Sequence, residues 1–462
     1  MRLSECLNSS DIDTLRNIAE RHGFDCHRSS KNSLMQTIMA HFRNRTFIRE
    51  TLAGLDSRAY RETLQQLTLD RRKSFSREDL AAIIKRATGD ASDQHQRLVS
   101  QLLRDGWLYR LGSQGGKSAY YLPEDLLQTM KEYITEELQK RVEQIESPPV
   151  VYRDDQLAIV RDAMQLIAFI NNHDVKITQD GVIYKRQLLL LLDSMEIRED
   201  LLNTGWRFGY GRRFHDYPDR FALIYDYCYG RGLIEELEEG LLALTDKVEP
   251  WLRQPDKQKL YDMVKFWRLL YRRPIPRLAL AVSTIASATR NRWTTKESVN
   301  QLISPYVNCY YYDSQQQVME MRIYQMLVYL GLLWFGKLPD GRDVMRLSDL
   351  GREILLEELP ADEPEPVLAD SAPLIVQPNF DVLLPASEAG KLAWELSQFS
   401  ELVRADMMRI YRLTKASVRR GLQNGWSTDR ILGFLDRHSG NLLPRNVKRM
   451  IERWSEETVP GL

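Results

Sequence analysis

The sequence predicts a mainly α-helical protein with small β-hairpins, an α+β chain made of tandem modules and a small C-terminal α/β domain. Two observations lead to this fold class. One order of elements occurs three times along the chain, and repetition of this kind is typical of stacked modules rather than of a single enzyme core. A different order, of short strands and capped helices, follows over residues 371–462.

The composition is that of a globular chain with room for several modules of ordinary size. Of the 462 residues, 43% are hydrophobic and 28% are charged, and the formal net charge is +0. A protein that coats nucleic acid is usually strongly basic, because neutralised phosphates supply most of its nonspecific affinity. The overall charge therefore gives no support to a dedicated nucleic-acid coat.

Membrane insertion and secretion are not indicated. Apolar runs such as Leu188–Leu192 are far shorter than the ~20 residues of a membrane-spanning helix, and the N-terminus has no apolar signal core. The four cysteines are scattered, which is typical of a reducing compartment. They are Cys6, Cys26, Cys228 and Cys309. We therefore expect a cytoplasmic protein without membrane contact.

Each copy of the repeated order has an amphipathic helix, a Gly, an apolar strand, a polar turn, a second strand and a further helix. The copies begin at Arg97, Arg220 and Arg322. Their turns are Gly112–Ser118, Glu238–Gly240 and Pro339–Gly341. A third helix, a glycine cap and a β-hairpin make up the C-terminal half of a winged helix-turn-helix. The sequence thus predicts tandem winged-helix modules.

Prolines and runs of charge set the expected domain limits. Ser147–Pro149 closes a long amphipathic helix that begins near Glu124, and the acidic, proline-rich residues 359–370 have no apolar period. The expected domains are a helical N-terminal cap (1–70), winged helices (71–147, 150–254 and 255–358), a linker (359–370) and a C-terminal domain (371–462). We expect few contacts to cross the linker.

The glycine-rich turn of the first module matches a phosphate-binding loop only in part. Gly112–Ser118 ends in Gly-Lys-Ser, but Leu111 occupies the position of the first glycine and a strand pattern follows. A phosphate-binding loop needs that glycine and a following helix, so we expect no nucleotide binding. Lys117 at the hairpin tip either contacts a DNA phosphate, as many wings do, or is simply solvated.

The sequence contains no recognisable set of catalytic or metal-binding residues. Cys6, His22, Cys26 and His27 lie close together without the paired spacing of a zinc module. Nucleophile-elbow, metalloprotease and dinucleotide-binding signatures are also absent. We therefore expect a protein that is not an enzyme and that binds no metal or cofactor.

Two aromatic runs allow either a core position or stacking on nucleic-acid bases. In the first, Phe221, Tyr225 and Cys228 lie on one face of a helix, which is typical of core packing. The second run is Tyr310–Tyr312. Exposed tyrosines stack on bases, but no basic residue adjoins either run, so we expect both runs to lie in the core.

The C-terminal region has its own order of elements. Two short strands surround a Pro-Asn turn in Leu374–Pro385, followed by a predicted helix at Gly390–Leu402 and a third strand at Arg409–Leu413. Three helices come next. The first is capped by Thr414, the second is capped by Ser427, and the last opens at Pro444 and runs through Trp454.

This order resembles the N-terminal accessory domain of XPB-type DNA helicases, a helicase-associated unit that recurs in bacterial proteins and in the non-ATPase TFIIH subunit that pairs with XPB. The matching positions, mostly core and cap residues, are Leu374, Val376, Phe380, Leu413, Thr414, Ser417, Gly421, Gly425, Ile431, Leu435, Ser439, Pro444, Val447 and Ile451. The preceding winged helices are similar to the architecture of that TFIIH subunit. An XPB-type helicase continues into two RecA-like motor domains, and no Walker A or Asp-Glu-x-His-type motif occurs in this sequence. The resemblance implies a docking domain without its motor.

The expected function is a non-catalytic adaptor or DNA-binding accessory protein for helicase-linked DNA repair or transcription. Its C-terminal domain would dock on a helicase or a transcription-repair assembly, with weak and nonspecific binding of duplex DNA. A stand-alone winged-helix DNA-binding transcriptional regulator is the alternative. The near-zero net charge favours protein contacts, and therefore the adaptor.

Basic residues are concentrated near the C-terminus. From Arg404 to Arg453 there are twelve Lys and Arg against four Asp and Glu. On the last predicted helix the basic residues share the side opposite Val447 and Ile451. Such a face contacts DNA phosphates or is merely solvated. The candidate nucleic-acid-binding residues are Arg97, Lys117, Arg412, Lys415, Arg419, Arg420, Arg445, Lys448, Arg449 and Arg453.

Overall fold

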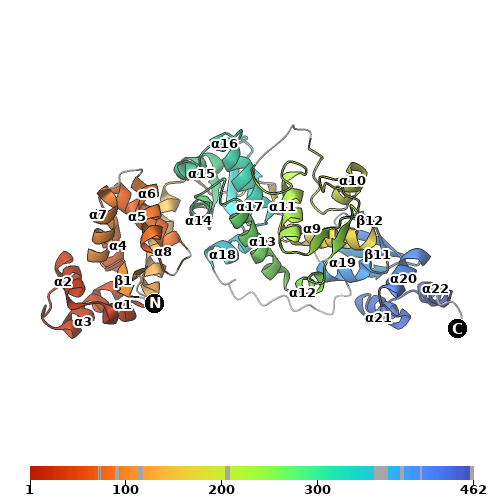
Figure 1. Cartoon of the computed structure of the whole chain (residues 1–462), viewed down its shortest axis with the longest axis horizontal. Helices are drawn as coiled ribbons and strands as arrows, with labels where there is room; N and C mark the ends of the chain where they lie inside the picture. The colour runs from red at the N-terminus through yellow and green to blue at the C-terminus, as the bar shows by residue number, and fades with distance from the viewer. Residues whose placement is uncertain are drawn as a thin grey trace. The chain divides into compact units, whose positions relative to one another are not determined.

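The computed structural model describes most of the chain (Figure 1). The described residues are 1–70, 72, 74–88, 93–112, 118–202, 209–357, 373–385, 390–405 and 408–457. They form two compact units, Met1–Pro148 with Ala279–Tyr306 and Pro149–Leu278 with Val307–Leu462. Helices dominate, and the strands pair antiparallel in small sheets, which confirms the mainly α fold class with β-hairpins. The finer domain limits stay a prediction.

Five helices open the first unit, as the sequence predicts for its N-terminal region. Several begin at a polar cap, because the first amides of a helix lack partners within it. Asp11 accepts a hydrogen bond from the Thr14 amide at 2.6 Å, and Ser30 accepts one from the Ser33 amide at 3.3 Å. The helices are α1 (Leu3–Ser9), α2 (Ile12–Arg21), α3 (Lys31–Arg43), α4 (Arg45–Ala53) and α5 (Arg58–Leu69).

The next elements follow the order predicted for the first module. Ser76 and Asp79 cap each other's amides at 3.0 and 2.9 Å. Strands β1 and β2 pair antiparallel, which confirms the first hairpin, and a bridge from Phe75 to Tyr120 extends it. The elements are α6 (Arg77–Thr88), α7 (Asp93–Arg104), β1 (Tyr109–Gly112), β2 (Ser118–Tyr121), α8 (Glu124–Lys140) and β3 (Gln144–Ile145).

One apolar core joins the N-terminal helices to this hairpin. Phe42 of α3 packs against the fully buried Trp107 with ring centroids 5.5 Å apart. The buried Asp105 carboxylate accepts hydrogen bonds from Tyr60 of α5 and Arg21 of α2, both at 2.7 Å. Because a buried charge is tolerated only when it is paired, Asp105 ties both helices to the loop after α7.

The chain returns to the first unit at Ala279, within α14, and stays in it through Tyr306. Strand β7 pairs antiparallel with β3. The elements of this segment are α14 (Leu278–Ala288), β7 (Trp293–Thr295), α15 (Lys296–Ile303) and the short 3-10 helix η1 (Ser304–Tyr306).

The second unit begins with the segment assigned to the second module, and the helix and hairpin predicted from Arg220 onward are present. Strands β5 and β6 pair antiparallel, which confirms the second hairpin. Phe221, Tyr225 and Cys228 of α11 are buried, as predicted for a core face. The elements are β4 (Tyr152–Arg153), α9 (Ala158–Asn172), α10 (Lys185–Asp193), α11 (Asp219–Gly230), β5 (Ile234–Glu236), β6 (Leu242–Leu244), α12 (Val248–Leu252) and α13 (Asp256–Leu270).

The third hairpin is also present. Strands β8 and β9 pair antiparallel, and β4 pairs with β8 on its other side. A π-helical segment precedes the hairpin. The elements are α16 (Gln315–Gln317), the π-helix η2 (Val318–Tyr324), α17 (Gln325–Tyr329), β8 (Leu333–Lys337), β9 (Asp343–Leu347) and α18 (Asp349–Leu356).

The C-terminal domain is an antiparallel sheet, in the order β10-β11-β13-β12, packed with four helices. Thr414 and Ser427 cap their helices as predicted. The prediction of a helix through Leu402 is wrong, because the helix ends at Ser397 and an unpredicted strand follows. The elements are β10 (Ile375–Val376), β11 (Asp381–Pro385), α19 (Gly390–Ser397), β12 (Glu401–Ala405), β13 (Met408–Arg412), α20 (Lys415–Gln423), α21 (Thr428–His438) and α22 (Arg445–Glu456).

Candidate docking and nucleic-acid surfaces

The C-terminal sheet has a packed face and an open face. Val382 and Tyr411, paired across β11 and β13, lie in the core with the four helices. Because side chains alternate along a strand, the neighbouring Leu383 and Ile410 point to the other face. Ile375 of β10 is paired with Leu383 and shares this side.

Apolar side chains on the open face are partly exposed to solvent. Ile375 is 54% exposed, and Met408, paired with Pro385, is 37% exposed. We call the group formed by Ile375, Leu383, Pro385, Met408 and Ile410 the outer sheet face. Contiguous exposed apolar residues are typical of protein contact sites. The signal in the sequence was the continuous apolar run Val382–Pro385, because side chains alternate between the two faces of a sheet and such a run places apolar residues on both.

Three of the predicted basic residues are held in ion pairs. Arg412 Nε donates a hydrogen bond to Asp381 at 2.8 Å, and this bond lowers the pKa of Asp381. Lys415 Nζ and Arg453 Nε both donate to the Glu457 carboxylate, at 2.7 and 2.9 Å, and these bonds lower the pKa of Glu457. The two exposed pairs to Glu457 stabilise the fold little, and all three pairs leave less net positive charge for a phosphate.

Arg420 is engaged inside the domain. Its guanidinium donates to the Ser400 carbonyl at 2.8 Å and to the Ser397 carbonyl at 3.3 Å. Carbonyls at the C-terminal end of a helix lack partners within the helix and accept such donors. Burial lowers the pKa of Arg420. Its half-buried side chain therefore serves the fold and offers little to a DNA phosphate.

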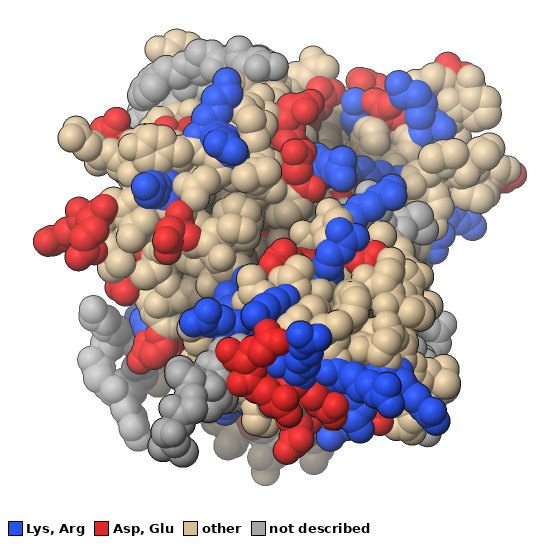
Figure 2. Space-filling view, turned by 90° about the vertical axis from the view of Figure 1, so that its right-hand side faces the viewer, with Lys and Arg blue, Asp and Glu red and all other residues tan. Residues whose placement is uncertain are grey.

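Four predicted residues are exposed and form no ion pair within the described part of the chain. They are Arg419, Arg445, Lys448 and Arg449. Helix α22 buries Val447 and Ile451 on its opposite side, as predicted, and packs on α20. On the face shown in Figure 2, Lys and Arg side chains lie beside Asp and Glu side chains. Basic and acidic side chains are thus interspersed on this face.

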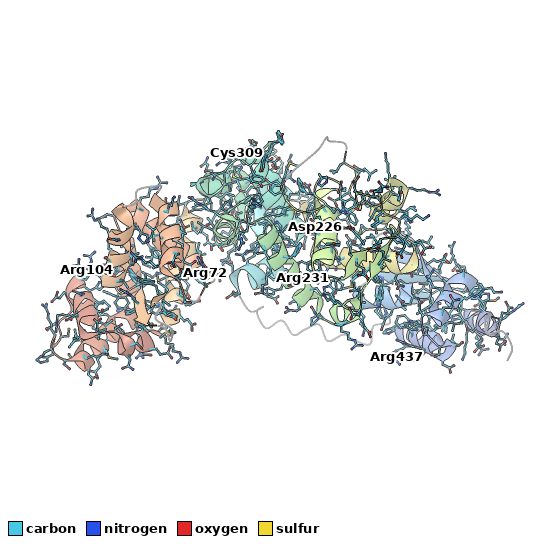
Figure 3. The ribbon with its side chains drawn as sticks, viewed as in Figure 1. Arg72, Arg104, Asp226, Arg231, Cys309 and Arg437 are labelled. Carbon is cyan, nitrogen blue, oxygen red and sulfur yellow. The ribbon has the colours of Figure 1, made fainter. Side chains whose placement is uncertain are left out.

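Arg97 lies on the exposed side of α7. Together with Gln96 and Arg104 of the same helix and Arg21 of α2, it lines a polar groove of about 490 Å³. Figure 3 labels Arg104 on this helix. Cations and amides on one helix face suit a polar ligand such as a nucleic acid. Lys117, the other candidate of this module, lies outside the described residues.

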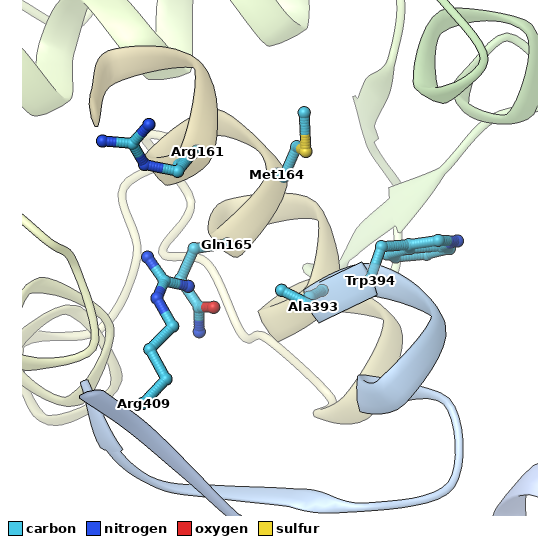
Figure 4. Close-up of a pocket in the computed structure, with 7 residues that line it drawn as sticks. Arg161, Met164, Gln165, Ala393, Trp394 and Arg409 are labelled. Carbon is cyan, nitrogen blue, oxygen red and sulfur yellow. The ribbon is translucent and has the colours of Figure 1, made fainter. Parts of the chain in front are cut away.

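The C-terminal domain also contacts α9 of the same unit, which sequence reasoning missed. Helix α19 packs on α9, and Arg161, Trp394 and Arg409 line a small cavity between them (Figure 4). Asn172 of α9 donates a hydrogen bond to the Ser397 carbonyl at 3.3 Å. The expectation that few contacts cross the linker is therefore wrong.

An ionic cluster holds this contact. Arg161 donates two hydrogen bonds to Glu196, each at 2.6 Å, and a guanidinium nitrogen of Arg409 lies 3.5 Å from the same carboxylate. Arg161 and Arg409 are only 9% and 1% exposed. The alternation of side chains along the predicted strand could have indicated this contact. It places Arg409 on the same side as the buried Tyr411, and a buried arginine requires a carboxylate partner.

No metal site is formed by the described residues. Among them, no group of three or more His, Cys, Asp and Glu side chains is placed to hold an ion. Cys6 and Cys228 are buried, and burial raises the pKa of Cys6 to about 11 and also raises the pKa of Cys228, which makes both thiols poor nucleophiles. No helix in the described ranges is long and apolar enough to cross a membrane.

Comparison with known proteins links the C-terminal domain to helicase-type proteins. Residues 374–457 match the family described as helicase conserved C-terminal domain. The matched residues extend from the start of β10 to the end of α22 and thus include the outer sheet face and the basic residues of α20 and α22. No curated protein matches the chain.

Proposed function

We propose that this chain is a non-catalytic adaptor whose C-terminal domain docks on a helicase motor protein through the outer sheet face. The observation that carries the proposal is an exposed apolar face on the same domain that matches a helicase family. The centre of a protein interface is apolar and its rim is polar. Here the ion pair between Asp381 and Arg412 borders the apolar residues, as a rim would.

Two finer assignments belong to this proposal. The C-terminal domain is an accessory unit of the XPB type, supported by its order of strands and capped helices. The three hairpin-bearing segments are winged helices, supported by the helix that precedes each hairpin, α7, α11 and α17. In this arrangement the adaptor serves helicase-linked DNA repair or transcription.

A second candidate function, duplex DNA binding by the modules themselves, is favoured by the unpaired cations. Arg419, Lys448 and Arg449 present positive charge on the C-terminal helices, and Arg97 does so on α7. Protein–DNA interfaces are polar and strongly positive, whereas the five residues of the outer sheet face are apolar. The two candidate functions therefore place the binding site on different surfaces, and substitutions on each surface can distinguish between them.

The test is capture of partners by the tagged full chain in its host, followed by mass spectrometry. We expect the wild-type chain to retain a protein with helicase motor domains, and Ile375→Glu/Met408→Glu to lose it. Leu442→Glu is the matched control, because Leu442 is 77% exposed in the same domain but lies in the loop between α21 and α22, outside the sheet. Retention of the helicase by the double variant contradicts the proposed face. Sequence-specific duplex binding with a steep salt dependence and no helicase partner supports the DNA-binding regulator.

A further inference from the structure

A tight turn carries two of the most exposed aromatic side chains in the described residues. Tyr310 and Asp313 exchange both backbone hydrogen bonds, at 3.0 and 2.9 Å. Tyr311 and Tyr312, at the tip, are 67% and 80% exposed. The prediction that Tyr310–Tyr312 lie in the core is therefore wrong for these two tyrosines. The turn directly follows Cys309, which Figure 3 shows at the edge of the ribbon.

Buried side chains next to the turn hold it in place. Asp313 accepts a hydrogen bond from the buried Arg322 at 3.0 Å. The Tyr310 ring packs on Tyr210 at 5.5 Å, and Tyr210 packs on Tyr271 at 5.1 Å.

Tyr311 adopts a left-handed backbone conformation, with φ of 50°. A bulky residue keeps this conformation only when its surroundings impose it, and such positions cluster at functional sites. The two tip tyrosines are thus presented to solvent in a fixed arrangement.

Positive charge accompanies the tyrosines. Arg272 and Arg273 come directly after Tyr271, the base of the ring stack, and both are exposed. Neither forms an ion pair within the described residues. Burial and the neighbouring Tyr311 raise the pKa of Tyr310, and Arg273 opposes that shift, which places its charge close to the turn. The carboxylate of the turn, Asp313, is already engaged by Arg322.

We propose that this tyrosine turn binds single-stranded DNA, with Tyr311 and Tyr312 stacking on bases and Arg272 and Arg273 contacting the backbone phosphates. Proteins that bind single strands combine aromatic platforms with cationic side chains in this way. A duplex keeps its bases stacked within the helix and offers no free base faces to the tyrosines. This site is separate from the outer sheet face and does not depend on the docking proposal.

The test is fluorescence anisotropy of a labelled fifteen-nucleotide oligo-dT titrated with the full chain. Stacking contributes about 1–3 kcal/mol per base, so Tyr311→Ala/Tyr312→Ala should raise Kd roughly 30-fold or more. The double Phe variant keeps the aromatic rings and should stay within roughly threefold of wild type. Tyr184→Ala is the control, because Tyr184 is a 52% exposed tyrosine elsewhere in the same unit, and its Kd should not change.

Photo-cross-linking gives a second, independent measurement. An oligonucleotide that contains 5-iodouracil should cross-link to a peptide that contains residues 309–312. An unchanged Kd in the double Ala variant, an equal loss in the double Phe variant, equal competition by a duplex, or cross-links elsewhere would each overturn the proposal. Ile375→Glu/Met408→Glu should bind oligo-dT normally, so failure of the docking proposal and failure of this one are distinguishable.

Discussion

Two buried arginines lie against the carboxylate of Glu196, and the substitution Glu196→Gln tests how much its negative charge contributes to stability. The substitution preserves the size of the side chain and one carbonyl acceptor but removes the negative charge. Arg161 then loses one of its two 2.6 Å hydrogen bonds to an anion, and Arg409 loses its counter-charge at 3.5 Å. Burial alone lowers the pKa of Arg161, and the hydrogen bonds to Glu196 outweigh that effect. An arginine stays protonated in proteins, so both guanidinium groups keep their charge in the variant and lose the negative charge of Glu196.

The expected magnitude follows from this geometry. Removing one partner of a buried ion pair costs about 3–5 kcal/mol, because the remaining charge is left uncompensated. Since the glutamine carbonyl still accepts one hydrogen bond, we expect the lower end, about 3 kcal/mol. A change of 1.4 kcal/mol corresponds to a factor of ten, so the contact between α9 and the C-terminal domain should open roughly 100-fold more often.

Hydrogen exchange followed by mass spectrometry measures this opening locally. Peptides from α9, α19 and β13 should lose protection by about two orders of magnitude, limited by global unfolding. The control is Glu249→Gln, because Glu249 and its partner Arg253 are 75% and 72% exposed and such pairs contribute less than about 1 kcal/mol. A change below threefold at α19 in Glu196→Gln would refute the electrostatic account of this contact.

Other side chains allow shorter tests. Burial raises the pKa of Asp226 from 3.8 to about 6. Its contribution to the free energy of unfolding is therefore complete below about pH 4 and is lost as the pH rises through 6. Urea unfolding across this range should show that Asp226→Asn removes this pH-dependent loss of stability. Replacing Arg419, Lys448 and Arg449 with Gln should make the logarithmic salt slope of duplex binding shallower by about 0.9 per lost phosphate contact, and an unchanged slope means that this face is solvated or binds an acidic protein. ATP turnover in a phosphate-release assay should stay at background, and turnover that disappears in Lys117→Ala contradicts the hairpin interpretation.

Features with local causes could be predicted from the sequence. Thr414 and Ser427 satisfy amides three residues ahead, so each cap is encoded within one helical turn. The hairpins need only two apolar strands and a polar turn between them. The burial of Val447 and Ile451 on α22 follows from helical periodicity alone.

The helix predicted through Leu402 shows where periodicity fails. Leu396, Phe399 and Leu402 have the three-residue spacing of a helix face, and all three contact the same core. Nevertheless Leu402 lies in a strand and is paired with Tyr411. Short apolar runs fit a helix or a strand equally well. Here the pairing with β13 makes the segment a strand, and that pairing cannot be read from the sequence of the segment alone.

The exposure of Tyr311 and Tyr312 was missed for a related reason. In sequence, Tyr310–Tyr312 is an aromatic run without an adjacent basic residue. Arg273, whose charge acts on Tyr310, is far away in sequence and follows Tyr271, the ring that packs on Tyr210. A binding surface assembled from distant segments has no signature within either of them.

The same argument limits what a count of charges can say about function. Twelve basic against four acidic residues between Arg404 and Arg453 indicate a strong positive surface, but the acids that matter lie outside that window. Asp381 pairs with Arg412, Glu457 pairs with two cations, and Glu196 lies against Arg409. The charge left to attract a phosphate is therefore smaller than the composition implies, while Ile375 and Met408 of the outer sheet face are exposed. This difference, rather than the net charge of the chain, supports the proposed adaptor over the proposed DNA-binding regulator.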